Sequence, residues 1–223
     1  MNCVAFDLDG VLVNSKNAYL KALLEVTSSL GHSFTNEEIE PLLGAPSRDV
    51  LTALMPDSPK DAAQGTTLLH ELVLRDEVIA SVTVSDSAPQ TLELIKSSGT
   101  YAAYLVTNSG PAFAEKVLSR SRLLEFFDGI RSADEGTPKE ARLRELRRSV
   151  CGKRCRTYYV GDLPRDVAAA RKACFTSVIV YNRMSWAYPE REKILEARPD
   201  FLIASLLELP PILGIPEIRQ LSI

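Results

Sequence analysis

Short apolar runs alternate with longer amphipathic stretches over most of this chain. The runs that we expect to form strands cover residues 3–6, 101–107, 127–131, 157–160, 177–181 and 201–203. Apolar runs of this length are typical of strands that are buried on both faces of a parallel sheet. Most stretches between them repeat their apolar residues at helical spacing. Strands that alternate with helices predict an α/β fold: a doubly wound, Rossmann-like parallel sheet with helices on both faces.

One long stretch breaks this alternation, because helical patterns follow one another there without an intervening strand. The expected helices of this stretch cover about residues 15–30, 35–44, 48–54 and 60–80. A polar junction follows at 84–89, and strands and helices alternate again after it. We therefore predict a helical cap, residues 15–85, that is inserted after the first strand. The core would consist of residues 1–14 and 86–223.

The composition of the chain excludes several classes of protein. The 223 residues carry a formal net charge of −3, so no overall basic field attracts nucleic acid. No apolar run reaches the roughly 18 residues that a membrane-spanning helix requires. Asp7 and Asp9 interrupt any apolar signal segment near the start. A cytoplasmic location is therefore expected, with no membrane partner.

The cysteines and basic residues give no clear chemical signal. Cys151 and Cys155 form a C-x-x-x-C spacing without a second pair of metal ligands, and His32 and His70 lie far away in the sequence. We expect neither a zinc site nor a disulfide, and hence reduced thiols. The basic run between Arg142 and Arg156 is expected to be a solvated helix face rather than a nucleic-acid site.

Polar side chains gather where the predicted strands end. In chain order, this set is Asp7, Asp9, Thr107, Asn108, Lys139, Asp162 and Asp166. Because the carboxyl ends of parallel strands lie along one edge of the sheet, these side chains should lie close together. Clustered carboxylates suit a hard cation such as Mg²⁺, which commonly also binds phosphate oxygens of a substrate. Thr107, Asn108 and Lys139 would then neutralise and orient the remaining phosphate oxygens.

Four segments of the chain resemble the four motifs of the haloacid dehalogenase superfamily. They are residues 6–12, residues 106–109, Lys139 and residues 160–166. The helical insertion resembles the C1-cap subclass, near the phosphoglycolate phosphatase group. The resemblance implies a Mg²⁺-dependent phosphatase that hydrolyses a small soluble phosphomonoester through an aspartyl-phosphate intermediate. Phosphoglycolate, sugar phosphates, nucleotides and pyrophosphate are all candidate substrates, and no oligomeric state is implied.

The same resemblance assigns roles to the acidic residues. Asp7 would be the nucleophile, and Asp9 would be the general acid and base. Mg²⁺ would be held by Asp7, by the backbone carbonyl of Asp9 and by Asp162. Asp166 would serve either as a further ligand or as a partner of a ligand.

The resemblance also assigns the groups that bind the substrate. Thr107, the backbone N–H of Asn108 and Lys139 would bind the phosphoryl group. Relatives often have a lysine immediately before a proline, whereas here Pro138 precedes Lys139; Lys139 is still the best candidate for this role. Arg48, in the predicted cap, would either contact the substrate or lie on an exposed helix.

Other chemistries of the superfamily fit the residues less well. Dehalogenases lack the second acid, which is present here as Asp9. Phosphonate-cleaving relatives use a cap lysine, and no lysine occurs between Pro41 and Pro59. Phosphosugar mutases carry a histidine at the position of Tyr19, so a mutase is the weaker alternative to a hydrolase. A non-catalytic sensor of phosphorylated ligands is the other alternative.

Overall fold

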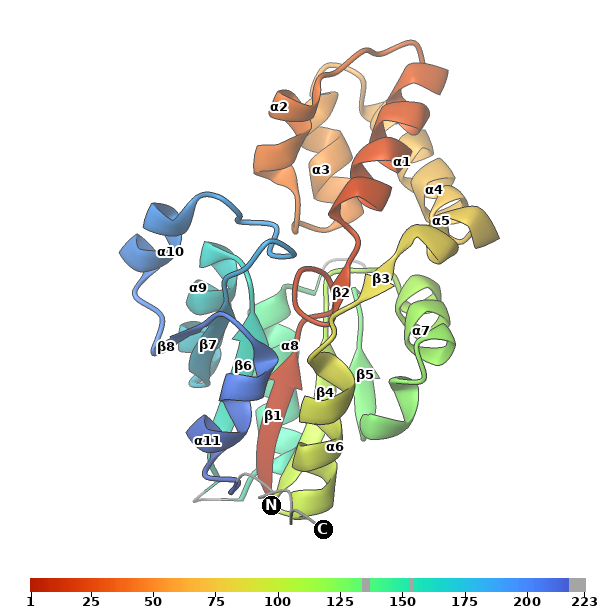
Figure 1. Ribbon diagram of the computed structural model, residues 1–223. Coiled ribbons are helices and arrows are strands. Elements are labelled where there is room, and N and C mark those ends of the chain that lie inside the picture. The colour runs from red at the N-terminus through yellow and green to blue at the C-terminus, as the bar shows by residue number, and fades with distance from the viewer. Residues whose placement is uncertain (134–136, 153–154, 217–223) are drawn as a thin grey trace.

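A six-stranded parallel sheet forms the centre of the core in the computed structural model, which describes residues 1–133, 137–152 and 155–216. The strand order is β5-β4-β1-β6-β7-β8 (Figure 1), and all neighbouring strands run parallel. The bounds are β1 Asn2–Phe6, β4 Tyr101–Val106, β5 Gly129–Arg131, β6 Thr157–Gly161, β7 Thr176–Val180 and β8 Phe201–Ile203. The predicted doubly wound α/β fold is confirmed, and β1 lies at its switch point, where the chain turns from one side of the sheet to the other.

Helices cover both faces of this sheet. They are α6 Ala88–Ser98, α7 Pro111–Arg120, α8 Lys139–Val150, α9 Pro164–Ala173, α10 Arg191–Ala197 and α11 Leu209–Leu213. Helices α6 and α11 cover one face, and α8 and α9 cover the other (Figure 1). Val4 and Phe6 of β1 belong to the cluster on one face, and Cys3 and Ala5 to the cluster on the other. This double burial explains why β1 is apolar without alternation.

Residues between β2 (Val13–Asn14) and β3 (Thr83–Val84) form a helical group that we call the insert. Its helices are α1 Lys16–Ser29, α2 Asn36–Ile39, α3 Ser47–Leu54, α4 Pro59–Leu72 and α5 Asp76–Ser81, with a short 3₁₀ helix at Glu40–Leu42. The insert lies over the carboxyl ends of the strands (Figure 1). Strands β2 and β3 pair antiparallel, so the chain enters and leaves the insert through one two-stranded ribbon.

Two helices of the insert are shorter than the sequence pattern predicts. The helix expected over residues 35–44 ends at Ile39, because Pro41 lacks an N–H and its ring would clash with the preceding turn. The helix expected over residues 60–80 is divided into α4 and α5. At the break, Lys116 Nζ of α7 donates to the carbonyl oxygen of Leu74 at 2.7 Å, a contact with the core that helical spacing cannot indicate.

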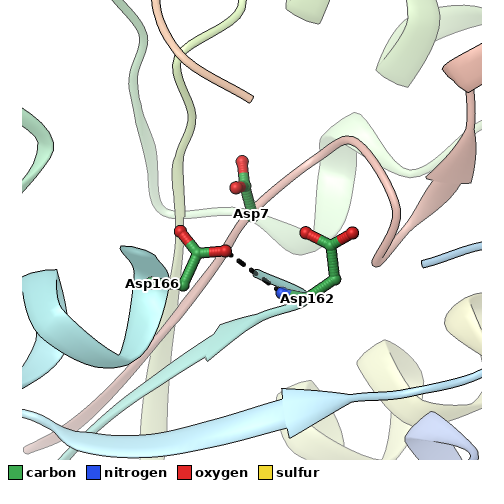
Figure 2. Close-up of side chains that lie close together, drawn as sticks. All are labelled: Asp7, Asp162 and Asp166. Carbon is green, nitrogen blue, oxygen red and sulfur yellow. Dashed lines mark hydrogen bonds between the residues drawn. The ribbon is translucent and has the colours of Figure 1, made fainter. Parts of the chain in front are cut away.

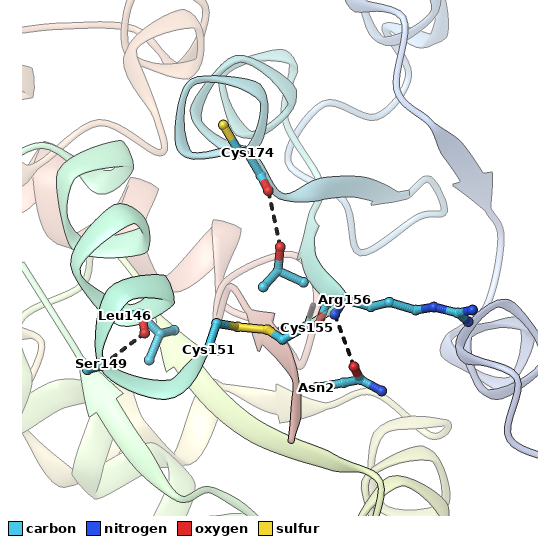
Figure 3. The surroundings of a disulfide bond; sticks show 8 residues. Asn2, Leu146, Ser149, Cys151, Cys155, Arg156 and Cys174 are labelled. Carbon is cyan, nitrogen blue, oxygen red and sulfur yellow. Dashed lines mark hydrogen bonds between the residues drawn. A yellow bond between two sulfur atoms is a disulfide. The ribbon is translucent and has the colours of Figure 1, made fainter. Parts of the chain in front are cut away.

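A disulfide joins Cys151 and Cys155 (Figure 3), so the prediction of reduced thiols is wrong for this pair. Cys151 directly follows α8, and Cys155 comes shortly before β6. The two Cα atoms lie 5.4 Å apart, a separation that a disulfide commonly spans. Cys3 is a buried thiol and Cys174 an exposed one. Lys153 and Arg154 of the basic run lie outside the described residues.

Candidate active site

Asp7 follows the central strand β1 and is almost fully buried. The backbone N–H of Leu8 donates to Asp7 Oδ1 at 2.9 Å, and Lys139 Nζ donates to Asp7 Oδ2 at 2.5 Å. The loop then turns at Gly10, whose φ is +72°. A Cβ atom on Gly10 would lie 2.0 Å from Asp162 Oδ2. Glycine at this position therefore allows the loop to pass directly against Asp162.

Three carboxyl groups from different elements face a shared space (Figure 2). Asp7 follows β1, Asp162 follows β6 and Asp166 lies in α9; one oxygen of each lies within 4.8 Å of the others. Burial raises the pKa of Asp7, although the Lys139 ammonium opposes the shift. Burial also raises the pKa of Asp162, and the Asp166 and Asp7 charges raise it further. A set of hard oxygen donors that is costly to ionise together fits a divalent cation.

Lys139 is the first residue of α8 and supplies positive charge to this cluster. Its Nζ donates to Asp7 and, at 2.8 Å, to Asp166 Oδ1. Burial by itself would lower the pKa of Lys139, but attraction to Asp166 and Asp7 outweighs burial and holds the pKa above its usual value. Lys139 is therefore a permanently charged partner of Asp7, although it lacks the Lys-Pro order that is common in relatives.

Asp166 fixes both Lys139 and the loop that follows β6. Its Oδ2 accepts from the backbone N–H groups of Asp162, at 3.2 Å, and Leu163, at 3.0 Å. These bonds make Asp166 an anchor for the loop that carries Asp162, as well as a member of the carboxylate cluster. On the other side of Asp162, the backbone N–H of Trp186 donates to Oδ2 at 2.5 Å.

Asp9 is as buried as Asp7 but has neutral partners. The hydroxyl groups of Ser15 and Ser109 donate to its two oxygens, and Tyr19 OH lies 3.1 Å from Ser109 Oγ. Burial raises the pKa of Asp9 to about 6; the two serine hydroxyls oppose this shift, and the Asp7 charge adds to it. A carboxyl group with this pKa can give and take a proton near neutral pH. Ser15 and Ser109 were not among the predicted site residues, although Ser109 directly follows Asn108.

Thr107 and Asn108 directly follow strand β4. The Thr107 backbone N–H donates to the carbonyl oxygen of Arg131 at 3.1 Å, and Thr107 Oγ1 accepts from Ser109 N–H at 3.1 Å. Arg142 of α8 donates to the carbonyl oxygen of Thr107 and is only 2% exposed. The prediction that Arg142 belongs to a solvated basic face is therefore wrong. The signal in the sequence was its spacing: Arg142 lies about one helical turn after Lys139 and therefore on the same side of the helix.

Two cavities adjoin these residues. A small one of about 30 Å³ is lined by Asp7, Asp9 and Asp162 together with residues of the insert. A larger one of about 700 Å³ is lined by residues of both the insert and the core, among them Arg48 and Lys139. Arg48 is the second residue of α3, and its side chain is exposed. Asn108 lines both cavities, and Asp166 of the carboxylate cluster lines the larger one.

Residues 4–180 match the haloacid dehalogenase-like hydrolase family, and the chain belongs to this family. Over 96% of its length it is 26% identical to pyrophosphatase PpaX from Bacillus mycoides, of which it covers 97%. A solved haloacid dehalogenase-like family protein from Streptococcus pneumoniae is similar, with a TM-score of 0.79 and 22% identity over 96% of this chain and 98% of that one. A predicted phosphoglycolate phosphatase from Haemophilus somnus gives a TM-score of 0.78 and 17% identity over 96% and 98%.

These similarities confirm three predictions made from the sequence: the superfamily, the Rossmann-like fold and an enzyme of the hydrolase class with phosphatase-named relatives. The structure brings all seven strand-end residues of the predicted set to one edge of the sheet. Within the described residues, no helix combines the length and apolar character that crossing a membrane requires.

Proposed function

We propose that this hydrolase is a Mg²⁺-dependent phosphatase that acts on a small soluble phosphomonoester through an aspartyl phosphate on Asp7. The observation that carries the proposal is the different environment of the two neighbouring acids. Asp7 is held against an ammonium group, whereas Asp9 has a pKa of about 6 and accepts hydrogen bonds from the hydroxyl groups of Ser15 and Ser109. A nucleophile and a proton donor are the two groups that phosphoryl transfer to a carboxylate requires.

In the first step, an Asp7 carboxylate oxygen forms a bond to phosphorus while the bond from phosphorus to the leaving oxygen breaks. Protonated Asp9 gives its proton to that leaving oxygen. In the second step, water attacks phosphorus, Asp9 takes a proton from the water, and the bond between Asp7 and phosphorus breaks to release inorganic phosphate. Lys139 reduces repulsion between Asp7 and the incoming phosphate, and Thr107 and the Asn108 N–H bind the phosphoryl oxygens.

The carboxylate cluster is the proposed cation site. Asp7, Asp162 and the backbone carbonyl of Asp9 would hold Mg²⁺, with Asp166 as a ligand or as the partner that orients Asp162 and Lys139. When bound, the ion would neutralise negative charge on the phosphoryl group. Removing divalent cations with a chelator should abolish hydrolysis, and added Mg²⁺ should restore it.

The insert is the proposed cap, with residues 15–85 closing over a core of 1–14 and 86–223. A cap that closes over the site would exclude water and bulky phosphoproteins. The cavity of about 700 Å³ would take the leaving group, with Arg48 as its contact from the cap.

A panel of small phosphates that includes pyrophosphate and phosphoglycolate would identify the substrate. We further propose a cytoplasmic enzyme, because such phosphorylated metabolites occur there.

The decisive test is hydrolysis of p-nitrophenyl phosphate in the presence of Mg²⁺. Asp7→Asn should lower kcat by about a thousandfold or more, because an amide cannot act as the nucleophile. Asp57→Asn, an exposed site in the insert, is the matched control and should retain wild-type activity. Turnover by Asp7→Asn would overturn the mechanism. Binding of phosphorylated ligands by the wild type without any turnover would favour a sensor instead.

A further inference from the structure

The Asn108 side chain lies between a buried arginine of the core and a backbone carbonyl of the insert. Arg142 Nη2 donates to Asn108 Oδ1 at 2.5 Å. On the other side, Asn108 Nδ2 donates to the carbonyl oxygen of Gly44 at 2.8 Å. One amide therefore connects α8 of the core with the loop that precedes α3 of the insert.

The chemistry of Arg142 decides which way this amide points. A guanidinium group can only donate hydrogen bonds, so the oxygen of the Asn108 amide must face Arg142. The amide nitrogen must then face the insert, where the Gly44 carbonyl needs a donor. Arg142 itself is fixed, because Nη1 also donates to the carbonyl oxygens of Thr107 and, at 3.1 Å, Arg131.

The Gly44 loop is seated closely against the core at this point. Gly44 has a φ of +82°, and a Cβ atom there would lie 2.2 Å from Leu163 Cδ1. The loop thus contacts the residues that follow β6 as well as those that follow β4. Both of these segments carry residues of the proposed phosphoryl site, Asp162 and Thr107.

We propose that the Asn108 side chain is the contact through which residues 107–108 help to hold the insert closed over the phosphoryl site, and that Arg142 is the positioning residue that orients it. This inference rests on the proposed phosphatase function. Because the backbone N–H of Asn108 would bind the phosphoryl group, one residue would join phosphate binding to closure. The insert would pack fully against the core only when residues 107–108 have the conformation that binds the phosphoryl group. Closure of the insert would therefore depend on the conformation of these two residues.

The first test is a set of kinetic measurements with p-nitrophenyl phosphate and Mg²⁺. Asn108→Ala removes the contact with Gly44, and Arg142→Lys keeps the charge but not the fork that reaches several acceptors. Arg144→Lys, on the exposed side of the same helix, is the matched control. For Asn108→Ala we expect KM to rise about tenfold, with a smaller change in kcat, because saturating substrate itself favours the closed arrangement.

A double variant shows whether Arg142 acts through Asn108. Arg142→Lys should raise KM severalfold in the wild type and clearly less in the Asn108→Ala background, because two residues of one network are not independent. An equal effect of Arg142→Lys in both backgrounds would overturn its positioning role. If Arg142→Lys fails to fold, the conclusion rests on Asn108→Ala and Asn108→Asp.

A second readout does not depend on turnover. Trp186 is the only tryptophan in the sequence; it is 9% exposed, and its ring lies 5.6 Å from that of Tyr19 in the insert. Loss of closure should therefore increase quenching of its fluorescence by acrylamide. In ligand-free protein we expect stronger quenching for Asn108→Ala, and at least as much for Asn108→Asp, which would face the Gly44 carbonyl with an acceptor. Arg144→Lys should match the wild type.

These readouts separate the two levels of the proposal. Wild-type protein that hydrolyses no phosphomonoester would contradict the proposed function, while quenching would still test the closing contact. Wild-type turnover with an unchanged KM and unchanged quenching in Asn108→Ala would overturn the inference and leave the proposed function intact.

Discussion

Asp7 and Asp9 lie two positions apart on one loop, and both are buried, yet their hydrogen-bond donors differ. An ammonium group and a backbone N–H donate hydrogen bonds to Asp7, and both favour its carboxylate form. Two hydroxyl groups donate hydrogen bonds to Asp9, and they favour its carboxylate form much less than a positive charge does. The Lys139 ammonium therefore opposes the rise that burial causes in the pKa of Asp7, whereas Asp9 exchanges its proton near pH 6.

The pKa of Asp9 leads to a prediction for the pH profile. Only protonated Asp9 can give a proton to a leaving group, so kcat/KM for an alkyl phosphate should fall as the pH rises through about 6. The hydroxyl of Ser109 stabilises the carboxylate and so lowers this pKa. Ser109→Ala should therefore raise the pKa and move the alkaline limb of the kcat/KM profile to higher pH.

The control for this experiment is Ser97→Ala, an exposed serine of α6. Its profile should overlay that of the wild type. An alkaline limb that stays in place, or that moves to lower pH, in Ser109→Ala would contradict the assignment of Asp9 as the proton donor.

The acids of the site could be predicted from the sequence because each stands where an apolar strand ends. Ser15 and Arg142 carry no such mark, whereas Ser109 directly follows Asn108 at the end of a predicted strand. Arg142 has the same sequence surroundings as the exposed Arg144 and Arg148, and only its rotation about α8 directs it to the buried side. Which residues of a charged helix face the core depends on where that helix is placed against the sheet.

Loops at the strand ends, rather than the strands, set the spacing of the carboxylates. Gly10 and Gly31 both have a positive φ, +72° and +83°, so alanine at either position pays the same backbone cost of about 1–2 kcal/mol. Only at Gly10 would the new Cβ atom also meet a neighbour, Asp162. We expect Gly10→Ala to lower the free energy of unfolding by about 1–3 kcal/mol more than Gly31→Ala does.

Denaturant unfolding of the two variants measures this difference. Gly10→Ala should also displace Asp162 and reduce phosphatase activity, whereas Gly31→Ala should leave kcat unchanged. Equal losses of stability in the two variants would mean that Asp162 moves aside without cost, contrary to the close fit described above.

At the scale of elements, the sequence predicted well the segments that are long and regular. The strands of the main sheet can be recognised from their own apolar runs, without knowledge of the strands beside them. Strands β2 and β3 have two residues each, too few to show alternation. The break between α4 and α5 was missed because the Leu74 carbonyl leaves the helix to accept a bond from Lys116, which is distant in sequence.

The fold class follows from alternation alone, but two properties of the whole molecule do not. Periodicity does not order the strands, although right-handed crossovers restrict the choices. Nor does it say how the insert lies over the strand ends, which depends on side chains such as Tyr19 and Asn108 meeting the core. The Cys151–Cys155 pair was missed for the same reason: its spacing has no signature in the sequence, and the separation of 5.4 Å between the two Cα atoms is a property of the folded chain.

The disulfide should affect stability more than activity. It closes a loop between residues four positions apart, and closing so small a loop stabilises a fold by about 2 kcal/mol. A reductant should lower the Tm of the wild type without changing kcat, because Lys139 lies at the opposite end of α8. The Cys151→Ser/Cys155→Ser double variant should show the lower Tm from the start and no response to reductant. If reductant still lowered the Tm of the double variant, the effect would have to come from the remaining cysteines, Cys3 and Cys174, and not from this disulfide.

The ribbon of β2 and β3 places Asn14 opposite Thr83, so the chain returns to the core almost where it left. For the topology of the sheet, the whole insert is therefore equivalent to one long loop whose ends lie side by side at Asn14 and Thr83. All the carboxylates and Lys139 belong to the core side of that ribbon. Under the proposed function, substitutions beyond the ribbon would therefore change the space for the leaving group while the strand order and the carboxylate cluster stay as they are.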